Sequence, residues 1–283
     1  MTIFMLFTSI TSMVLNNSLL NRVCKKSLKT DGDVALFNVF CYAVCILMFG
    51  ILLLGQSISL YTVVLGLLFG ITTAVSNMNK MLALSAGPMH ITNLVTTSSM
   101  IIPALSGVFF GESLSIYKLI TIAVLIFFIY MSLDRTDGKR INKKWLVFTI
   151  IAFIFQGAIG VLQKIHQTSA HKSEVAAFLL VSFLCSAITC LINARVSTTT
   201  CRPGKKFITL SIICGICVFL MNYINLKLSG LLPTQLFFPL VNGSSIILSS
   251  AVAVIIFKER LTKKQAAGLI GGIISLIAIC FVN

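Results

Sequence analysis

Two pairs of polar side chains, one in each half of an otherwise apolar chain, are the residues best suited to hold a ligand. Asn77 and Lys80 lie three positions apart, and so do Asn222 and Asn225. Residues at this spacing share one face of a helix. Amides donate and accept hydrogen bonds, so these faces suit a neutral or zwitterionic solute, and Lys80 can meet a carboxylate or phosphate. Two alternatives stay open: such amides also bond neighbouring membrane helices, and a lysine near a helix end can extend to the membrane interface.

A second group of candidate ligand contacts consists of hydroxyls and one further amide. Thr97 and Ser98 match Ser244 and Ser245 in the second half, and Asn242 stands just ahead of that pair. The alternative is that these hydroxyls bond carbonyl groups of their own helices. Together the pattern predicts a solute-binding site made of Asn77, Lys80, Asn222, Asn225, Thr97, Ser98, Ser244, Ser245 and Asn242.

Catalytic and metal-binding chemistry is not indicated by the sequence. The chain has 7 acidic residues, and all of them fall in predicted loops or at predicted helix ends. A carboxylate that binds a drug cation or a coupling proton inside the membrane is therefore not expected. The 3 histidines have no metal-ligand spacing, and the chain has no catalytic dyad, phosphate-binding loop or ATPase motif. We expect no catalytic residue, no metal and no cofactor, and any transport must be driven by a gradient.

The elements that position these residues are apolar helices. The chain is 57% hydrophobic and 10% charged, with a mean hydropathy of +1.02, which is too apolar for an ordinary water-soluble domain. A helix needs about 20 apolar residues to cross a bilayer. The sequence predicts an all-α integral membrane protein with ten transmembrane helices, at 2–21, 35–55, 60–80, 89–110, 116–133, 145–164, 175–194, 207–227, 234–257 and 264–281.

The two halves of the chain repeat one another. Residues 101–133 align with residues 248–280, and earlier landmarks recur in the same order. Because each copy has an odd number of predicted spans, the second copy enters the membrane in the opposite direction. The prediction is two inverted five-helix repeats, 1–138 and 139–283. Small residues spaced four apart predict close helix packing in Gly66, Gly70 and Ala74, and in Ala267, Gly271 and Ser275.

Positive charge is concentrated in alternate loops. Of the 22 Lys and Arg residues, 18 fall in or beside the odd-numbered loops between predicted spans. The positive-inside rule places those loops in the cytoplasm and both termini outside it. Arg22 and Lys164 stand at the ends of matching spans, and we expect both to act as interfacial anchors.

Each repeat ends with two spans joined by a short turn, FGESL at 110–114 and FKERL at 257–261. In this turn, and in its two five-helix repeats, the chain resembles the EamA-like branch of the drug/metabolite transporter superfamily. The second turn departs from the family pattern, because Lys258 replaces a glycine. The resemblance implies a ten-helix secondary transporter with both termini in the cytoplasm, an orientation opposite to the one that the charges indicate.

These features together predict a secondary transporter for a small polar metabolite, such as an amino acid or a sugar, by alternating access between the repeats. Its expected partners are a small-molecule solute and the lipid bilayer of a prokaryotic plasma membrane, with no nucleic acid. A nucleotide-sugar or phosphate-ester exchanger is an alternative, although such cargo needs several cations and only Lys80, Lys164 and Lys227 stand near enough. An intramembrane enzyme or lipid-handling scaffold is the alternative from another class.

Overall fold

The computed structural model is a bundle of helices and describes residues 2–26, 30–55, 57–87, 89–112, 115–132, 143–197, 204–257 and 262–281. No strand occurs among these residues. In chain order the helices are α1 (Thr2–Lys26), α2 (Asp31–Leu53), α3 (Leu60–Ala86), α4 (Met89–Ser98), α5 (Ile101–Ser106), the 3-10 helix η1 (Gly107–Phe110), α6 (Ile116–Ser132), α7 (Lys143–Thr168), α8 (Val175–Val196), α9 (Lys205–Leu231), α10 (Thr234–Phe257) and α11 (Lys263–Phe281).

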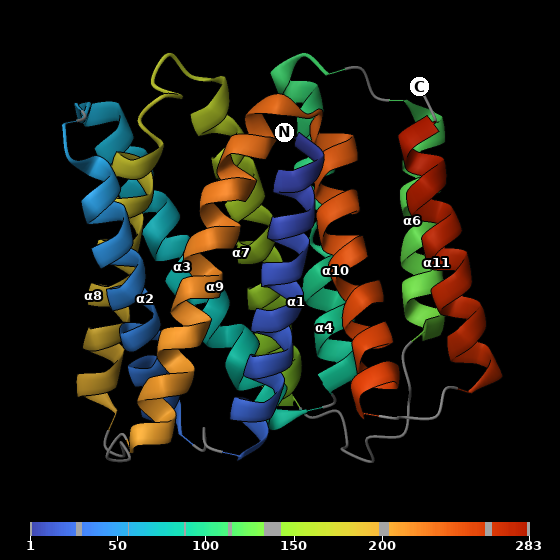
Figure 1. Ribbon diagram of the computed structural model, residues 1–283, viewed down its shortest axis with the longest axis horizontal. Coiled ribbons are helices and arrows are strands. Elements are labelled where there is room, and N and C mark those ends of the chain that lie inside the picture. The colour runs from blue at the N-terminus through green and yellow to red at the C-terminus, as the bar shows by residue number, and fades with distance from the viewer. Residues whose placement is uncertain are drawn as a thin grey trace.

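The long helices stand side by side and run alternately in opposite directions (Figure 1). Both ends of the chain lie at the same end of the bundle, at the top of the view, and we call this the terminal face. At the opposite end, α7, α9 and α11 each begin with a pair of lysines. We call that end the basic face.

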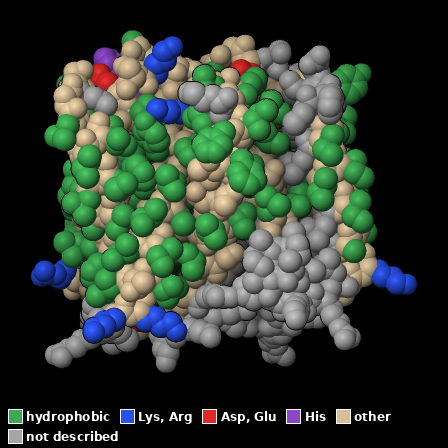
Figure 2. Space-filling view, in the orientation of Figure 1, with side chains coloured by type: hydrophobic (Ala, Val, Ile, Leu, Met, Phe, Trp, Pro, Cys, Tyr) green, Lys and Arg blue, Asp and Glu red, His purple; other side chains and the backbone are tan. Residues whose placement is uncertain are grey.

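Length and composition fit an integral, multi-pass membrane protein. Six of the described helices, α1, α2, α3, α7, α8 and α9, are long and apolar enough to cross a membrane, and shorter apolar helices cover 95–110, 119–128, 234–248 and 266–275. Apolar side chains such as Phe4, Leu47 and Ile188 are exposed on the outside. Figure 2 shows hydrophobic side chains over most of the described face, with Lys and Arg near its upper and lower edges. Such a surface suits lipid and not water.

The prediction of one continuous helix at 89–110 is wrong, because this segment is divided into α4, α5 and η1. α4 ends at Ser98, a turn follows, and the chain continues as α5 and η1. Pro103 has no N–H to continue an α-helical ladder, and its ring crowds the preceding turn. The N–H of Ile102 bonds the Ser99 carbonyl oxygen at 3.0 Å, which tightens the chain there. The other predicted helices each correspond to one helix, and α1 and α3 extend furthest past their predicted ends.

The first half of the bundle packs against the second in a reciprocal pattern. α2 lies against α8 and α6 lies against α11. α1 packs on α9, as α7 packs on α3, and α3 packs on α8, as α9 packs on α2. Exchanging α1, α2 and α3 with α7, α8 and α9 therefore returns the same set of neighbours.

Small residues form close helix contacts at Gly70 and Gly271, as the sequence predicts, but Ala267, at the start of the second predicted ridge, is exposed. A side-chain carbon added at Gly70 would overlap the Ser182 carbonyl oxygen of α8, and one added at Gly215 would overlap the Cys41 carbonyl oxygen of α2. Gly271 likewise lies directly against the Phe128 ring of α6. Hydrogen bonds follow the same reciprocal pattern across these contacts: the Ser186 hydroxyl donates to the Gly70 carbonyl at 2.8 Å, and the Cys45 thiol to the Gly215 carbonyl at 3.5 Å.

Candidate solute site

Two adjoining cavities lie between the halves of the bundle. One has a volume of about 70 Å³ and receives side chains from α7, α9 and the terminal-face end of α10; we call it the terminal-side cavity. The other has a volume of about 90 Å³ and receives side chains from α1, α3 and α4; we call it the basic-side cavity. The two share the side chains of Met13, Gln156, Ile159, Met221, Asn222 and Asn242.

The structure brings most of the predicted site residues together around these cavities. The basic-side cavity is lined by Asn77, Lys80, Thr97, Asn222, Asn242 and Ser245, and the terminal-side cavity by Asn222, Asn225 and Asn242. Ser98 and Ser244 belong to the lining of neither cavity. Asn242 and Ser245 are three positions apart and share one face of α10, whereas Ser244 points to another side of that helix.

The amides of the two halves have different hydrogen-bond partners. Asn77 Nδ2 donates to the Tyr42 hydroxyl at 2.9 Å, so this amide also holds α3 against α2. Asn222 Nδ2 donates instead to the Val218 carbonyl of its own helix at 2.8 Å. The repeat-related positions are thus equivalent in place but not in bonding.

The second member of each pair reaches α1. Lys80 Nζ donates to Asn17 Oδ1 at 3.4 Å, and Asn225 Oδ1 accepts a hydrogen bond from the Ser9 hydroxyl. α1 therefore lies between the two polar pairs and contributes polar groups of its own. Lys80 is the one charged side chain among the residues that line the two cavities.

Several lining residues were not predicted from the sequence, and two of them carry buried polar atoms without a partner. Asn16 is 6% exposed and Thr73 is 4% exposed, and within the described residues Asn16 Oδ1 and Thr73 Oγ1 have no hydrogen-bond partner. Both side chains line the basic-side cavity. A buried, unpaired polar atom is costly, so atoms of this kind mark a place where a ligand or water binds.

The repeat in the sequence does not reveal these two residues. The positions that match Asn16 and Thr73 in the second half hold Ala158 and Val218, which are apolar. The signal that was available is local: Thr73 stands one turn before Asn77 on the same face of α3, and two adjacent amides occur inside an apolar stretch at 16–17.

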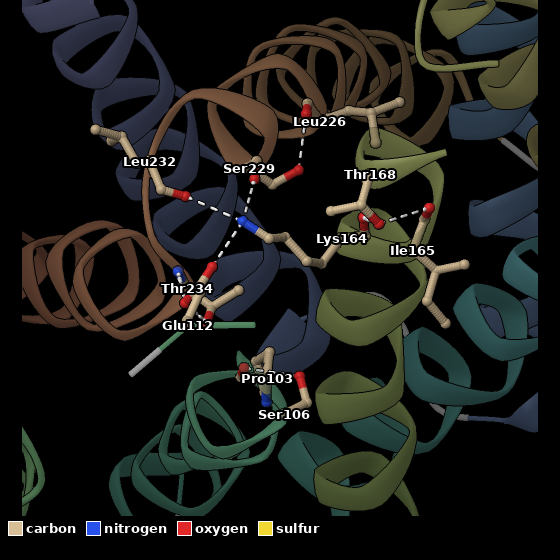
Figure 3. Close-up of polar contacts among 10 residues, drawn as sticks. All are labelled: Pro103, Ser106, Glu112, Lys164, Ile165, Thr168, Leu226, Ser229, Leu232 and Thr234. Carbon is tan, nitrogen blue, oxygen red and sulfur yellow. Dashed lines mark hydrogen bonds and ion pairs between the residues drawn. The ribbon is translucent and has the colours of Figure 1, made fainter. Parts of the chain in front are cut away.

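A buried ion pair lies beyond the terminal-side cavity. Lys164 Nζ and Glu112 Oε1 are 2.8 Å apart, with side chains only 9% and 16% exposed. Figure 3 shows Lys164 reaching from α7 toward Glu112 and the end of α9. The expectation that Lys164 is an interfacial anchor is wrong, because its charge is used inside the protein. The matching turn at 258–261 and the side chain of Arg22 lie outside the described residues.

Each partner of the ion pair also caps a helix end. Lys164 Nζ donates to the Ser229 and Leu232 carbonyl oxygens at 3.2 and 3.4 Å, where α9 ends. Glu112 Oε2 accepts hydrogen bonds from the Thr234 N–H, at 2.8 Å, and from the Thr234 hydroxyl, where α10 begins. The cation thus meets the negative end of one helix dipole and the carboxylate meets the positive end of the next. This cluster ties the turn after η1 to the second half of the chain.

A second polar cluster on the terminal face joins the loop before α8 to the start of α3. Glu174 accepts hydrogen bonds from the Ser59 N–H at 2.9 Å and the Ser59 hydroxyl at 2.8 Å, and it pairs with His171 at 3.0 Å. Burial alone raises the pKa of Glu174, but hydrogen bonds from Ser59, Thr62 and His171 outweigh it and lower the pKa to about 2. The Glu174 carboxylate therefore stays ionised and acts as a link between helices.

Comparison with solved structures finds a protein of similar fold. A solved crystal structure superimposes with a TM-score of 0.71 over 99% of both chains, at 16% sequence identity. At this identity the likeness concerns the fold alone. Neither a scan against protein-family models nor a search of curated proteins finds a match.

Proposed function

We propose that this protein is a secondary transporter that carries a small polar metabolite across a membrane by alternating access. The observation that carries the proposal is the central pair of cavities, where Asn77 from one half and Asn222 from the other line one polar space inside an apolar bundle. Polar groups are costly at this depth and are kept where they bind something. A polar solute that passes between the halves would explain why these polar side chains are kept there.

We also infer ten transmembrane helices in two inverted five-helix repeats, as in the EamA-like branch of the drug/metabolite transporter superfamily. Support comes from the reciprocal packing of α1, α2 and α3 with α7, α8 and α9, and from the pairing of α6 with α11. α4, α5 and η1 together then correspond to α10. Such repeats place the solute site near the midplane, where the two halves meet.

The proposed setting is a prokaryotic plasma membrane with the basic face in the cytoplasm and the termini outside. The lysine pairs at the starts of α7, α9 and α11 all lie on one side of the bundle, as the positive-inside rule requires of a cytoplasmic face. The resemblance to the EamA-like branch implies the opposite orientation, and the charges carry more weight because they belong to this chain.

In the proposed mechanism the Glu112–Lys164 pair closes the site toward the terminal face. Gln163 lines the terminal-side cavity, and the next residue, Lys164, binds Glu112 at the terminal-face end of α7. Gly160 lies directly against Pro103 and Phe238, which narrows the same end. Opening on that side requires the two halves to separate there, and closing restores the ion pair and both helix caps.

The main rival, a nucleotide-sugar or phosphate-ester exchanger, fits the lining less well. A phosphate group in a protein site is usually held by several cationic or N–H donors. Among the described lining residues only Lys80 is charged, since Lys164 is bound to Glu112 and Lys227 lines neither cavity. We therefore favour a smaller cargo with at most one anionic group.

Counterflow in liposomes tests the proposal. Liposomes that contain the purified protein are loaded with unlabelled glycine, L-serine, D-glucose or a nucleotide sugar, and the same labelled solute is added outside at trace concentration. Transient accumulation of a labelled amino acid or sugar, absent from protein-free liposomes, is expected. Accumulation of the nucleotide sugar alone favours the rival, and no counterflow by folded protein with any of these solutes contradicts the proposal.

A further inference from the structure

A third cavity lies between α3 and α8, near the basic face, and we call it the side cavity. Its volume is about 370 Å³, and it shares no lining residue with the two central cavities. Apolar side chains, among them Met78 and Leu82, form part of its wall. The polar part of the lining consists of Asp31, Asn79, Thr189, Asn193 and Ser197.

Several polar side chains of the side cavity present oxygen atoms to it. Asn79 Nδ2 donates to the Val75 carbonyl and Asn193 Nδ2 to the Thr189 carbonyl, at 2.8 and 2.9 Å. Each amide therefore turns its NH₂ toward its own helix and its oxygen away from that carbonyl. The Thr189 hydroxyl likewise donates to the Cys185 carbonyl at 2.9 Å, which leaves its oxygen as an acceptor. Such a lining suits a ligand that donates hydrogen bonds.

The side cavity also carries one negative charge and, among its described lining residues, no positive charge. Asp31 is exposed in the first turn of α2, and its carboxylate makes no hydrogen bond or ion pair within the described part of the chain. The cavity lies where α8 ends, and the negative end of a helix dipole favours a cation. A primary ammonium group fits both features, because it combines a positive charge with three N–H donors.

The side cavity opens toward the membrane at the height of the lipid headgroups. Val196, in its lining, is 76% exposed, and Ile188 and Ile192 on the adjoining face of α8 are exposed as well. Asn193 lies in the last turn of α8 and Asp31 in the first turn of α2, and both of these helix ends are at the basic face (Figure 1). The headgroup layer on each side of a bilayer is about 5 to 7 Å thick, close to the rise of one helical turn. A lipid headgroup can therefore reach these oxygens while its acyl chains stay in the bilayer.

Positive charge lies near the side cavity but not in its described lining. Arg195 is exposed in the last turn of α8, and Lys205 and Lys206 begin the neighbouring helix α9 at the same face. A carboxylate in the cavity with cations at the same end of the bundle is complementary to a headgroup that has both an ammonium and a phosphate. A soluble amine has no phosphate for these cations, which repel it.

We propose that the side cavity binds a membrane phospholipid whose headgroup ends in a primary ammonium, such as phosphatidylethanolamine, with that ammonium between the Asp31 carboxylate and the Asn193 amide oxygen. Such a site is independent of transport and of the central cavities. Phosphatidylcholine is the informative comparison, because its trimethylated ammonium carries the same charge but has no N–H donor. Charge alone does not separate the two lipids, whereas hydrogen bonds to the oxygens of the cavity do.

Lipid selectivity of the full-length protein in detergent tests this assignment. Shifts of its thermal unfolding transition are titrated with phosphatidylethanolamine and phosphatidylcholine of identical acyl chains, and with soluble ethanolamine. Phosphatidylethanolamine is expected to bind at least about tenfold more tightly than phosphatidylcholine, because only its ammonium donates hydrogen bonds. Equal binding of the two lipids overturns the proposal, and so does the absence of any shift with phosphatidylethanolamine. Binding of ethanolamine as tight as that of phosphatidylethanolamine identifies a soluble amine as the ligand and also overturns it.

Variants at Asp31 and Asn193 then locate the ammonium. Asp31→Asn and Asn193→Ala should each reduce the preference for phosphatidylethanolamine to about threefold or less, whereas Asp31→Glu, which keeps the charge, should retain it. Thr209→Ala on α9 is the matched control, because it removes a side chain bonded at 3.0 Å to the carbonyl four residues earlier, outside the side cavity. The unfolding transition of each variant without lipid shows that it is folded. A preference left unchanged by Asp31→Asn or by Asn193→Ala overturns the site.

Discussion

At the scale of single residues, the helix face on which an asparagine lies decides whether it can contact a solute. Asn222, Asn242 and Asn79 all donate Nδ2 to the carbonyl four residues earlier in their own helices. The first two line the central cavities, whereas Asn79 lines a separate cavity of about 370 Å³ between α3 and α8. Bonding to the helix is therefore the same in all three, and only position distinguishes a proposed solute contact from a helix-bound amide.

Asn222→Ala provides the corresponding prediction. Removal of its Oδ1 is expected to weaken solute binding by about 1 to 3 kcal/mol, because a ligand donor is left without its acceptor. Thermal stability should change little by comparison, since the lost Nδ2 hydrogen bond is internal to α9. Asn79→Ala, which removes the same bond in α3, is the matched control and should bind solute normally. Equal binding by both variants and the parent protein would show that Asn222 only packs.

At the scale of elements, the Glu112–Lys164 pair is oriented by the helices that it caps. The Lys164 ammonium group, which comes from α7, lies at the carboxyl end of α9, and the Glu112 carboxylate lies at the amino end of α10. Each charge is therefore matched to a helix dipole as well as to its partner. The two charges of this ion pair are therefore not interchangeable. Reversing it would place a cation at the start of α10 and a carboxylate against the carbonyl groups of α9.

We therefore predict that reversing both charges does not restore the stability of the protein. Each single change, Glu112→Gln or Lys164→Gln, should destabilise the protein by about 3 kcal/mol or less, because a partly buried charge loses its partner. The double reversal Glu112→Lys with Lys164→Glu should be no more stable than either single change, as measured by thermal unfolding in detergent. Recovery of parental stability by the double reversal would show that the pair alone matters and that the helix caps do not.

Close helix contacts give a second prediction at this scale. Gly70→Ala and Gly215→Ala should each destabilise the bundle by about 1 to 3 kcal/mol, because the new methyl group meets a backbone carbonyl of the facing helix, which cannot move aside easily. Gly50→Ala in α2 is the control, since open space surrounds that position. It should leave stability unchanged or raise it slightly. Destabilisation by Gly50→Ala as large as that by Gly70→Ala would contradict the packing account.

At the scale of the whole molecule, the sequence predicted the helical elements and most residues of their packing ridges, because long apolar runs and four-residue spacings are local signals. It did not predict the break after Ser98 or the buried partner of Lys164. Pro103 was a local signal for the break, whereas the ion pair depends on tertiary context, because it joins residues from opposite halves. Asn16 and Thr73 were missed for a different reason, because polar atoms needed by a bound solute do not have to be repeated in both halves.

Orientation is a property of the whole bundle, and the charge distribution predicts that both termini lie outside the cytoplasm. A reporter enzyme that is active only in the cytoplasm, fused after Asn283, is expected to give no activity in cells. The same reporter inserted in the 133–142 segment should be active because the next helix, α7, begins at the basic face. Activity at the C-terminal fusion alone would reverse the orientation and agree with the arrangement that the EamA-like resemblance implies.

Energy coupling is also decided by the whole pathway, because a proton-driven carrier commonly titrates an acid or histidine along it. The described lining of the two cavities contains neither, and Glu112, beyond the terminal-side cavity, is held by Lys164 and Thr234. Transport is therefore expected to be facilitated diffusion or exchange, or to be coupled to an ion held by neutral oxygens. In liposomes that contain the protein, a pH gradient without a membrane potential should not drive solute accumulation. Uphill uptake that collapses with a protonophore would contradict this expectation, and its loss in Glu112→Gln would identify Glu112 as the titrating group.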